Sequence, residues 1–229
     1  MLKIAVIGLG HFGSHLATEL TQMDHEVLAI DKDPDKVEAV RDKVAHAVIA
    51  DAADKKALED LGIADYDCGI VAIGESFEGS LLACAHLQEM KIKRMVARVV
   101  SPVHERILKQ MKIEELILPE GDAAEQLAKR FSIPGLLFSF EVSKDYSIVE
   151  VEVPKWAIGK TIIELRLRES FGINLVTIIR ERHKDQMLTL GKKKTIEVLG
   201  VPDKDQLLQK SDILLLFGKE KEINKFLSE

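Results

Sequence analysis

The stretch Leu2-Lys3-Ile4-Ala5-Val6-Ile7-Gly8-Leu9-Gly10-His11-Phe12-Gly13 places a short apolar run directly before a G-x-G-x-x-G motif. A second apolar run, residues 26–30, ends at Asp31. An apolar strand, a glycine-rich turn, a following helix and an acid about 20 residues further on form a dinucleotide-binding fingerprint. The sequence therefore predicts that the amino-terminal part of the chain binds a nucleotide.

Each glycine of the motif has its own expected role. Gly8 permits a tight turn, Gly10 lets a phosphate approach the backbone, and Gly13 lets the next helix pack close to the strand. The helix that begins near His11 directs unpaired N–H groups and a partial positive charge toward an anion. The expected phosphate-binding stretch therefore comprises Gly8, Leu9, Gly10, His11, Phe12 and Gly13.

Asp31 is expected to bind the ribose, because its carboxylate can accept hydrogen bonds from both hydroxyls. The same charge repels a 2′-phosphate, so NAD or an adenosine nucleotide is favoured over NADP.

Composition limits the class of protein. The chain has 229 residues, 46% of them apolar and 31% charged, with a formal net charge of −6. This negative charge argues against a nucleic-acid-binding protein. Cys68 and Cys84 are expected to be small buried or helix-face residues of a reduced, cytoplasmic protein, since they form no CxxC pair. Neither a leader nor an apolar stretch of about 20 residues is evident, so we expect a cytoplasmic chain.

Apolar runs and amphipathic stretches alternate as far as about residue 132. Strands are expected at 3–7, 26–30, 45–49, 68–73, 94–99 and 115–118, and helices at 13–22, 34–43, 54–61, 77–90, 102–110 and 122–130. This alternation predicts an α/β fold, a Rossmann-type doubly wound parallel sheet, over residues 1–133.

Residues 134–229 are expected to form a second, smaller α+β domain. Strands are expected at 136–142, 147–153, 174–180, 187–190, 195–198 and 212–217, helices at 161–169 and 220–227, and a polar loop at 181–185.

In a parallel sheet the ligand lies beyond the carboxyl ends of the strands. Lys32 is expected near the adenine or a phosphate. Asp51 contacts the adenine edge or serves as a turn or helix-capping residue, and Arg98 binds phosphate or forms an ion pair. The full set at these strand ends is Lys32, Asp51, Ala52, Ala72, Ile73, Gly74, Glu75 and Arg98.

The sequence shows few signs of catalysis. Neither Tyr66 nor Tyr146 has a lysine four residues later, and the HExxH, GxSxG and P-loop patterns are missing. His183 lies in a charged stretch and is expected to be solvated. We therefore expect a protein that binds a nucleotide without transforming it, with an NAD-dependent oxidoreductase as the alternative.

Several blocks of sequence together resemble the regulatory subunits of the bacterial Ktr/Trk potassium uptake systems, which carry an RCK domain (regulator of potassium conductance) followed by a TrkA C-terminal domain. The resemblance covers essentially the whole chain. Its blocks are residues 5–13, 48–52, 71–75, 101–108, 117–120, 147–151, 165–168, 172–176 and 212–218.

This resemblance implies a cytoplasmic subunit, held at the inner face of the membrane by a potassium channel or transporter subunit. It implies homodimers that assemble into a homo-octameric ring, whose shape depends on bound ATP/ADP or NAD(H). Such a ring works by allostery: a ligand that binds one shape more tightly shifts the population toward it.

Two residues matter for the ligand under this resemblance. Relatives usually have arginine at the position of His11, where it meets the terminal phosphate of ATP bound to the neighbouring subunit. A shorter, mostly neutral histidine favours ADP, NAD(H) or a pH-sensitive phosphate contact. Glu120 matches a glutamate at the dimer interface, where Mg²⁺ or another divalent cation can bridge; a helix-capping acid is the alternative.

Some relatives also bind cyclic di-AMP across a dimer interface of the second domain. The matching residues are Arg168, Ile173, Asn174 and Leu175. A hydrophobic strand at a homodimer interface is the alternative interpretation.

Overall fold

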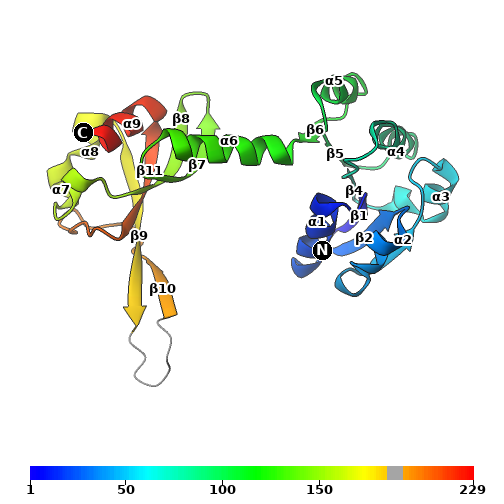
Figure 1. Cartoon of the computed structure of the whole chain (residues 1–229), viewed down its shortest axis with the longest axis horizontal. Helices are drawn as coiled ribbons and strands as arrows, with labels where there is room; N and C mark the ends of the chain where they lie inside the picture. Colours follow the sequence, from blue (N-terminus) through cyan, green and yellow to red (C-terminus); the bar gives the residue numbers. More distant parts are fainter. Residues whose placement is uncertain (185–192) are drawn as a thin grey trace. The chain divides into compact units, whose positions relative to one another are not determined.

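A computed structural model describes residues 1–184 and 193–229, which divide into two compact units, Met1–Gly121 and Asp122–Glu229 (Figure 1). This division falls earlier than the boundary expected between residues 133 and 134. The expected boundary places helix α6 (Pro119–Ser132) with the first domain. In the structure, most of that helix belongs to the second unit.

The first unit is built on a six-stranded parallel sheet with the order β3-β2-β1-β4-β5-β6. This order confirms the Rossmann-type prediction, and β1 lies between β2 and β4 at the centre. The strands are β1 (Lys3–Ile7), β2 (Glu26–Asp31), β3 (His46–Ile49), β4 (Cys68–Val71), β5 (Met95–Arg98) and β6 (Glu115–Ile117).

Helices connect these strands, and side-chain caps mark where several begin. Asp33 accepts a hydrogen bond from the Asp35 N–H at the start of α2, and Ser101 accepts one from the His104 N–H at the start of α5. The helices are α1 (His11–Gln22), α2 (Pro34–Glu38), α3 (Lys55–Asp60), α4 (Phe77–Glu89) and α5 (Pro102–Gln110).

The helix expected at 34–43 is shorter than predicted. It ends at Glu38, and a separate 3-10 turn, η1, covers Arg41–Lys43. Between them, Val40 has φ −114°, outside the helical range, and its side chain is buried.

Both faces of the first sheet are buried, as a parallel sheet requires. Ala5 and Ile7 of β1 belong to one core cluster, while Ile4 and Val6 belong to another. Cys68 and Cys84 are buried free thiols, as predicted, and burial raises the pKa of Cys84 to about 12.

The second unit contains an antiparallel five-stranded sheet with the order β10-β9-β11-β8-β7. The strands are β7 (Leu136–Ser143), β8 (Tyr146–Glu152), β9 (Asn174–Lys184), β10 (Lys193–Val198) and β11 (Asp212–Lys219). The first unit also contains the short helix η2 (Ile63–Asp65). The helices of the second unit are η3 (Lys155–Ala157), α7 (Ile162–Leu165), α8 (Leu167–Phe171) and α9 (Glu220–Ser228). A smaller, mixed α and β domain is thereby confirmed.

The single helix expected at 161–169 is instead two short helices. Arg166 between them has a left-handed backbone, φ 47° and ψ 44°. Leu165 and Leu167 are both buried, although residues two apart point in very different directions on a continuous helix. The break at Arg166 lets both leucines enter one core.

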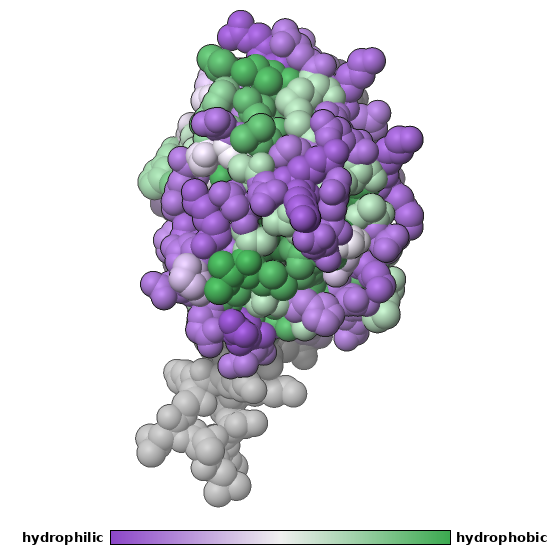
Figure 2. Space-filling view, turned by 90° about the vertical axis from the view of Figure 1, so that its right-hand side faces the viewer, coloured by the Kyte–Doolittle hydropathy of each residue, from purple (hydrophilic) through white to green (hydrophobic). Residues whose placement is uncertain are grey.

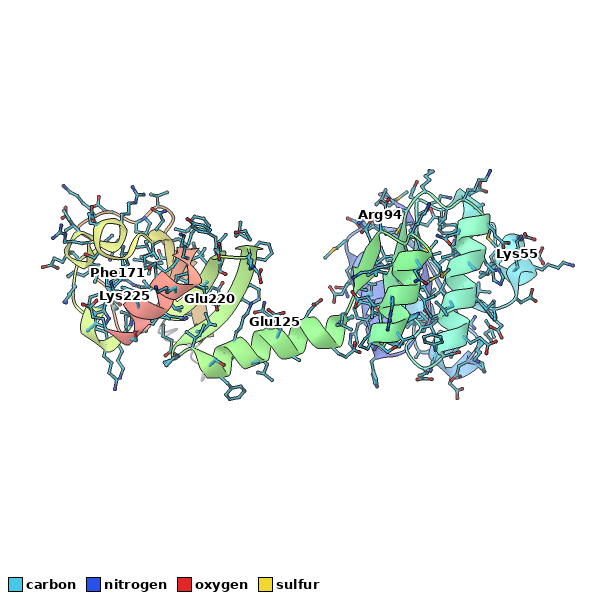
Figure 3. All side chains as sticks on the ribbon, turned by 90° about the horizontal axis from the view of Figure 1, so that it is seen from above. Lys55, Arg94, Glu125, Phe171, Glu220 and Lys225 are labelled. Atoms are coloured by element: carbon cyan, nitrogen blue, oxygen red, sulfur yellow. The ribbon has the colours of Figure 1, made fainter. Side chains whose placement is uncertain are left out.

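Aromatic packing closes that core. The Phe226 ring meets the Phe171 ring edge-on, with 5.4 Å between the ring centres. The Lys225 ammonium lies 5.6 Å from the Phe171 ring centre; both residues are labelled in Figure 3. The Trp156 indole N–H donates to the Phe226 carbonyl at 3.1 Å. These contacts fix α9 against α8.

Strand β9 extends beyond its predicted end. The polar loop expected from residue 181 is wrong as far as Lys184, because β9 continues to that residue by pairing with β10. Backbone pairing makes strands of polar sequences as well as apolar ones. The strand expected at 187–190 lies outside the described residues.

Candidate functional site

A cavity of about 540 Å³ opens at the carboxyl ends of β1, β2 and β4, where a doubly wound sheet binds its ligand. It brings together nearly all of the predicted nucleotide-binding residues. Those that line it are Gly8, Gly10, His11, Phe12, Asp31, Lys32, Asp51, Ala52, Ala72, Ile73, Gly74, Glu75 and Arg98. Leu9 and Gly13 do not line the cavity; both are buried beneath it.

The glycine turn depends on close backbone packing. Gly8 has φ +96°, and a Cβ there would lie 2.8 Å from the Ile73 nitrogen. A Cβ on Gly13 would lie 1.8 Å from the Gly8 carbonyl oxygen. A Cβ on Gly10 would meet no protein atom within 4 Å, so the backbone at Gly10 faces open space at the start of α1.

The Asp31 carboxylate is held by two backbone groups. The Leu9 N–H donates to Oδ2 at 2.7 Å, and the Asp33 N–H donates to Oδ1 at 2.9 Å. Asp31 therefore ties the glycine turn to the end of β2. Each oxygen has a second lone pair, so the carboxylate can still accept hydrogen bonds from ribose hydroxyls.

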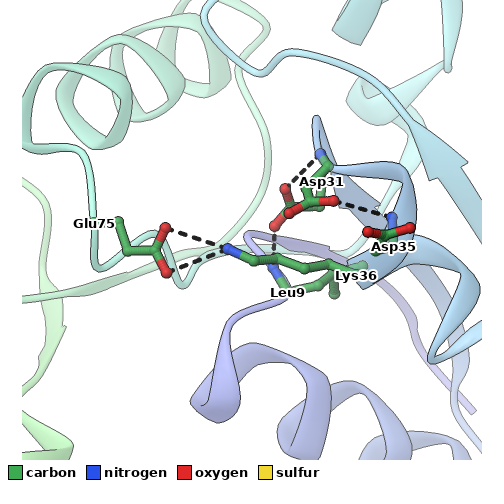
Figure 4. Close-up of polar contacts among 6 residues, drawn as sticks. Leu9, Asp31, Asp35, Lys36 and Glu75 are labelled. Carbon is green, nitrogen blue, oxygen red and sulfur yellow. Dashed lines mark hydrogen bonds and ion pairs between the residues drawn. The ribbon is translucent and has the colours of Figure 1, made fainter.

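A lysine that sequence reasoning missed crosses the same region (Figure 4). The Lys36 ammonium donates to both Glu75 oxygens, at 3.2 and 3.3 Å. The bond to Glu75 raises the pKa of Lys36, and the nearby charges of Asp31 and Asp33 raise it further. The ion pair joins the first turn of α2 to the loop after β4.

Arg98 lies at the end of β5 with only 16% of its side chain exposed. Its guanidinium donates to Glu120 and lies 5.8 Å from the Phe12 ring centre. Among the described residues, nothing bonds to its buried Nε. The ion-pair alternative for Arg98 is therefore present, on the wall of the cavity.

The loop after β3 forms the adenine side of the predicted site. Asp51 Oδ1 accepts the Ala53 N–H at 2.9 Å, so the turn role expected as one alternative for Asp51 is present. Ala52 and Ala53 line the cavity. Lys32, on the neighbouring strand end, is exposed there. Contact of Asp51 or Lys32 with adenine stays a prediction.

Other cavity residues also escaped sequence reasoning. Ser76 caps α4 by accepting the Gly79 N–H at 3.0 Å, and both residues line the cavity. A serine just after Gly74-Glu75 is a helix-start signal that could have indicated this. Lys36 gave no such signal.

The remaining predicted residues are Glu120 and four residues of the second unit. Glu120 lines the cavity, and in the part of the chain described here no group of three metal-binding side chains is found. In the second unit Arg168 is exposed and Asn174 and Leu175 are half-buried. Ile173 is 0% exposed and supports the core instead of presenting a surface.

Within residues 1–184 and 193–229, no helix combines the length and apolar character needed to cross a membrane.

Comparison with known proteins gives a consistent result over the whole chain. The family model of the TrkA-N domain matches residues 4–119, and that of the TrkA-C domain matches residues 147–229. Ktr system potassium uptake protein C of Bacillus subtilis (strain 168) is 32% identical over 98% of this chain and 95% of its own length. Protein A of the same system and organism is 32% identical over 99% and 96%.

Among solved structures, the GsuK RCK domain has a TM-score of 0.63 at 18% identity, covering 99% of this chain and 48% of that one. This likeness shows that the two chains share a fold.

Proposed function

Because this chain belongs to the family of TrkA-N and TrkA-C domain proteins, with Ktr potassium uptake proteins among its homologues, we propose that it is a nucleotide-sensing regulatory subunit of a potassium uptake system. In this role it gates a separate membrane channel or transporter and performs no chemistry on the nucleotide. Differential affinity of the ligand for two conformations supplies the driving force.

One observation carries the proposal: the glycine turn, the Asp31 carboxylate and the Arg98 guanidinium all reach a single cavity. The first turn of α1 offers N–H groups to a phosphate, with Gly10 leaving the approach open. Asp31 offers acceptors to the ribose, and Arg98 offers positive charge. The first and third of these functions suit the phosphates of an adenine nucleotide, and the second suits its ribose.

The proposed ligand is ATP/ADP or NAD(H). Asp31 supports a nucleotide with a free 2′-hydroxyl. His11 is exposed on the rim of the cavity, where an arginine would supply a fixed charge to a terminal phosphate. A histidine at this position in place of an arginine supports ADP or NAD(H) over ATP.

Glu120 is the residue that we propose as a ligand of Mg²⁺ or another divalent cation. Its carboxylate pairs with Arg98 in this structure. Hard cations take several oxygen ligands, so a bound nucleotide or a second subunit would have to complete the set.

Cyclic di-AMP is proposed as a second ligand of the TrkA-C unit, through Arg168, Asn174 and Leu175. The exposed Arg168 supports it as a phosphate-binding group. The buried position of Ile173 limits the apolar wall to Leu175 and its neighbours.

We further propose that the chain forms homodimers and a homo-octameric ring at the cytoplasmic face of its membrane partner. Phe77 and Leu82 on α4 and Val103 on α5 are exposed. Figure 2 shows groups of apolar residues within a largely hydrophilic surface. Exposed apolar clusters of this kind support contact with other protein surfaces.

The test uses the full-length purified chain. Mass spectrometry after denaturation identifies any retained ligand, and calorimetry compares ADP, ATP, NAD and NADH. Reconstitution with the membrane subunit in vesicles then measures nucleotide-dependent potassium flux. We expect adenine-nucleotide binding and a ligand-dependent flux. Absence of binding, or sustained consumption of NADH with a carbonyl substrate, would contradict the proposal.

A further inference from the structure

We propose that His86 is a positioning residue for the adenine side of the nucleotide cavity, acting through the carbonyl of Ala53. The inference rests on the proposed nucleotide-sensing function. His86 does not line the cavity itself, whereas Ala53 does.

The hydrogen bond of His86 shows which tautomer its ring adopts. His86 Nε2 lies 3.1 Å from the Ala53 carbonyl oxygen. A carbonyl oxygen only accepts, so Nε2 must carry a proton. In the neutral ring Nδ1 is then unprotonated, and it is buried without a partner among the residues that the structure describes. The one N–H donor of the neutral ring is therefore used for the hydrogen bond to the Ala53 carbonyl.

That bond completes the fixation of Ala53. Its N–H donates to Asp51 Oδ1 at 2.9 Å, and its carbonyl accepts from His86. At the other end of this segment, the Ala50 N–H donates to the Asp31 carbonyl at 3.0 Å. The segment between Ala50 and Ala53 is therefore anchored at both ends, which fixes the backbone at Ala52, whose N–H is predicted to contact an adenine edge.

A second link between the same elements is weaker. The Lys55 ammonium on α3, labelled in Figure 3, lies 2.8 Å from Glu89 on α4. Both side chains are exposed, and exposed ion pairs contribute little stability. Of these two links, the part-buried His86 bond is therefore the one that we expect to fix the loop against α4 more strongly.

The experiment measures affinities of full-length variants for two probes, ADP and inorganic pyrophosphate. Replacing His86 with leucine should weaken ADP binding about fivefold, the equivalent of one net hydrogen bond, and leave pyrophosphate binding unchanged. His86→Gln keeps an N–H donor of similar reach, so it should restore most of the ADP affinity. His46→Leu, at the exposed start of β3, is the matched control and should behave like the wild type.

Each alternative outcome has a separate meaning. Wild-type protein that binds neither probe would contradict the proposed function. Wild-type binding with an unchanged H86L variant, or equal losses for both probes, would overturn the role of His86. Equal losses in H86L and H86Q would do the same.

A measurement on the wild type remains decisive if H86L does not fold. Nitrogen-15 NMR of the imidazole should show the Nε2–H tautomer, and the Nδ1–H tautomer would overturn the proposal.

Discussion

The Arg98 guanidinium donates a hydrogen bond to the Glu120 carboxylate on the wall of the cavity. Arg98 is largely buried, whereas Glu120 is 63% exposed. The cation expected to bind a nucleotide phosphate is thus already paired with an anion, which lies in the first turn of α6. A phosphate that binds the same guanidinium N–H of Arg98 would compete with Glu120, and we therefore expect nucleotide binding to be coupled to the position of that turn.

Removing the charge of Glu120 should strengthen nucleotide binding. In EDTA, which excludes a bridging metal, Glu120→Gln should tighten ADP binding about fivefold, because the phosphate no longer competes with a carboxylate. Calorimetry measures the effect. Glu125→Gln alters an exposed acid paired with Lys129 on the same helix and should change nothing. Weaker ADP binding by E120Q would contradict the competition.

Asp31→Asn should weaken ADP and adenosine alike, by about tenfold. An amide replaces one of the two acceptors that hold the Leu9 and Asp33 N–H groups, and the negative charge facing the ribose is lost. Asp35→Asn, in the exposed first turn of α2, is the control. A variant that loses ADP affinity but retains adenosine affinity would place the ribose elsewhere.

His11→Arg should raise the affinity for ATP relative to ADP, by about three- to tenfold. A fixed guanidinium on the rim would meet the additional phosphate with charge-assisted hydrogen bonds. The ratio of the two dissociation constants is the measurement. An unchanged ratio would remove His11 from the phosphate site.

Acid should destabilise the protein through His104. Its ring is fully buried on α5, with Nδ1 accepting the Val100 N–H at 3.3 Å. Burial lowers the pKa of His104 below its ordinary value of 6.5. Below about pH 6.5 the unfolded chain therefore binds a proton that the folded chain does not, and stability falls as pH falls.

His104→Gln should flatten this dependence by up to about 1.4 kcal/mol per pH unit. Urea unfolding at several pH values from 7 to 5 provides the measurement. The exposed His15→Gln should retain the wild-type slope. An H104Q slope equal to that of the wild type would show that His104 titrates identically in both states.

The second unit should depend strongly on the pair of Arg180 and Asp212. Two bonds of 2.7 Å join them, and the Gln209 N–H donates to the same carboxylate at 2.8 Å. Because the Asp212 side chain is fully buried, Asp212→Ala leaves a largely buried cation unpaired and should cost about 3 kcal/mol of unfolding free energy. Glu105→Ala breaks an exposed pair with Lys109 and should cost under about 1 kcal/mol.

The strand order and the main cavity residues could be predicted because their signals are local. Gly8, Gly13 and Asp31 stand at fixed distances along the chain, and each has a steric or electrostatic requirement that few other residues satisfy. The parallel sheet then brings its strand ends together, so Arg98 joins the same cavity although it is far away in sequence.

Other features depend on contacts that no spacing specifies. Lys36 meets Glu75, and His86 meets Ala53, through pairing of distant segments by common residue types. The break at Arg166 was missed for a related reason. The sequence there favours a continuous helix, and only the shared core of Leu165 and Leu167 requires the turn.

Because the second unit begins at Asp122, most of helix α6 packs as part of that unit. Gln126 donates to the Ser139 carbonyl at 2.6 Å, and Lys129 lies 3.8 Å from Glu141 on the same strand. A gene fragment that starts at codon 134 would discard these partners and uncover one side of β7. Anyone who wishes to express the carboxy-terminal part separately should begin the fragment before the helix.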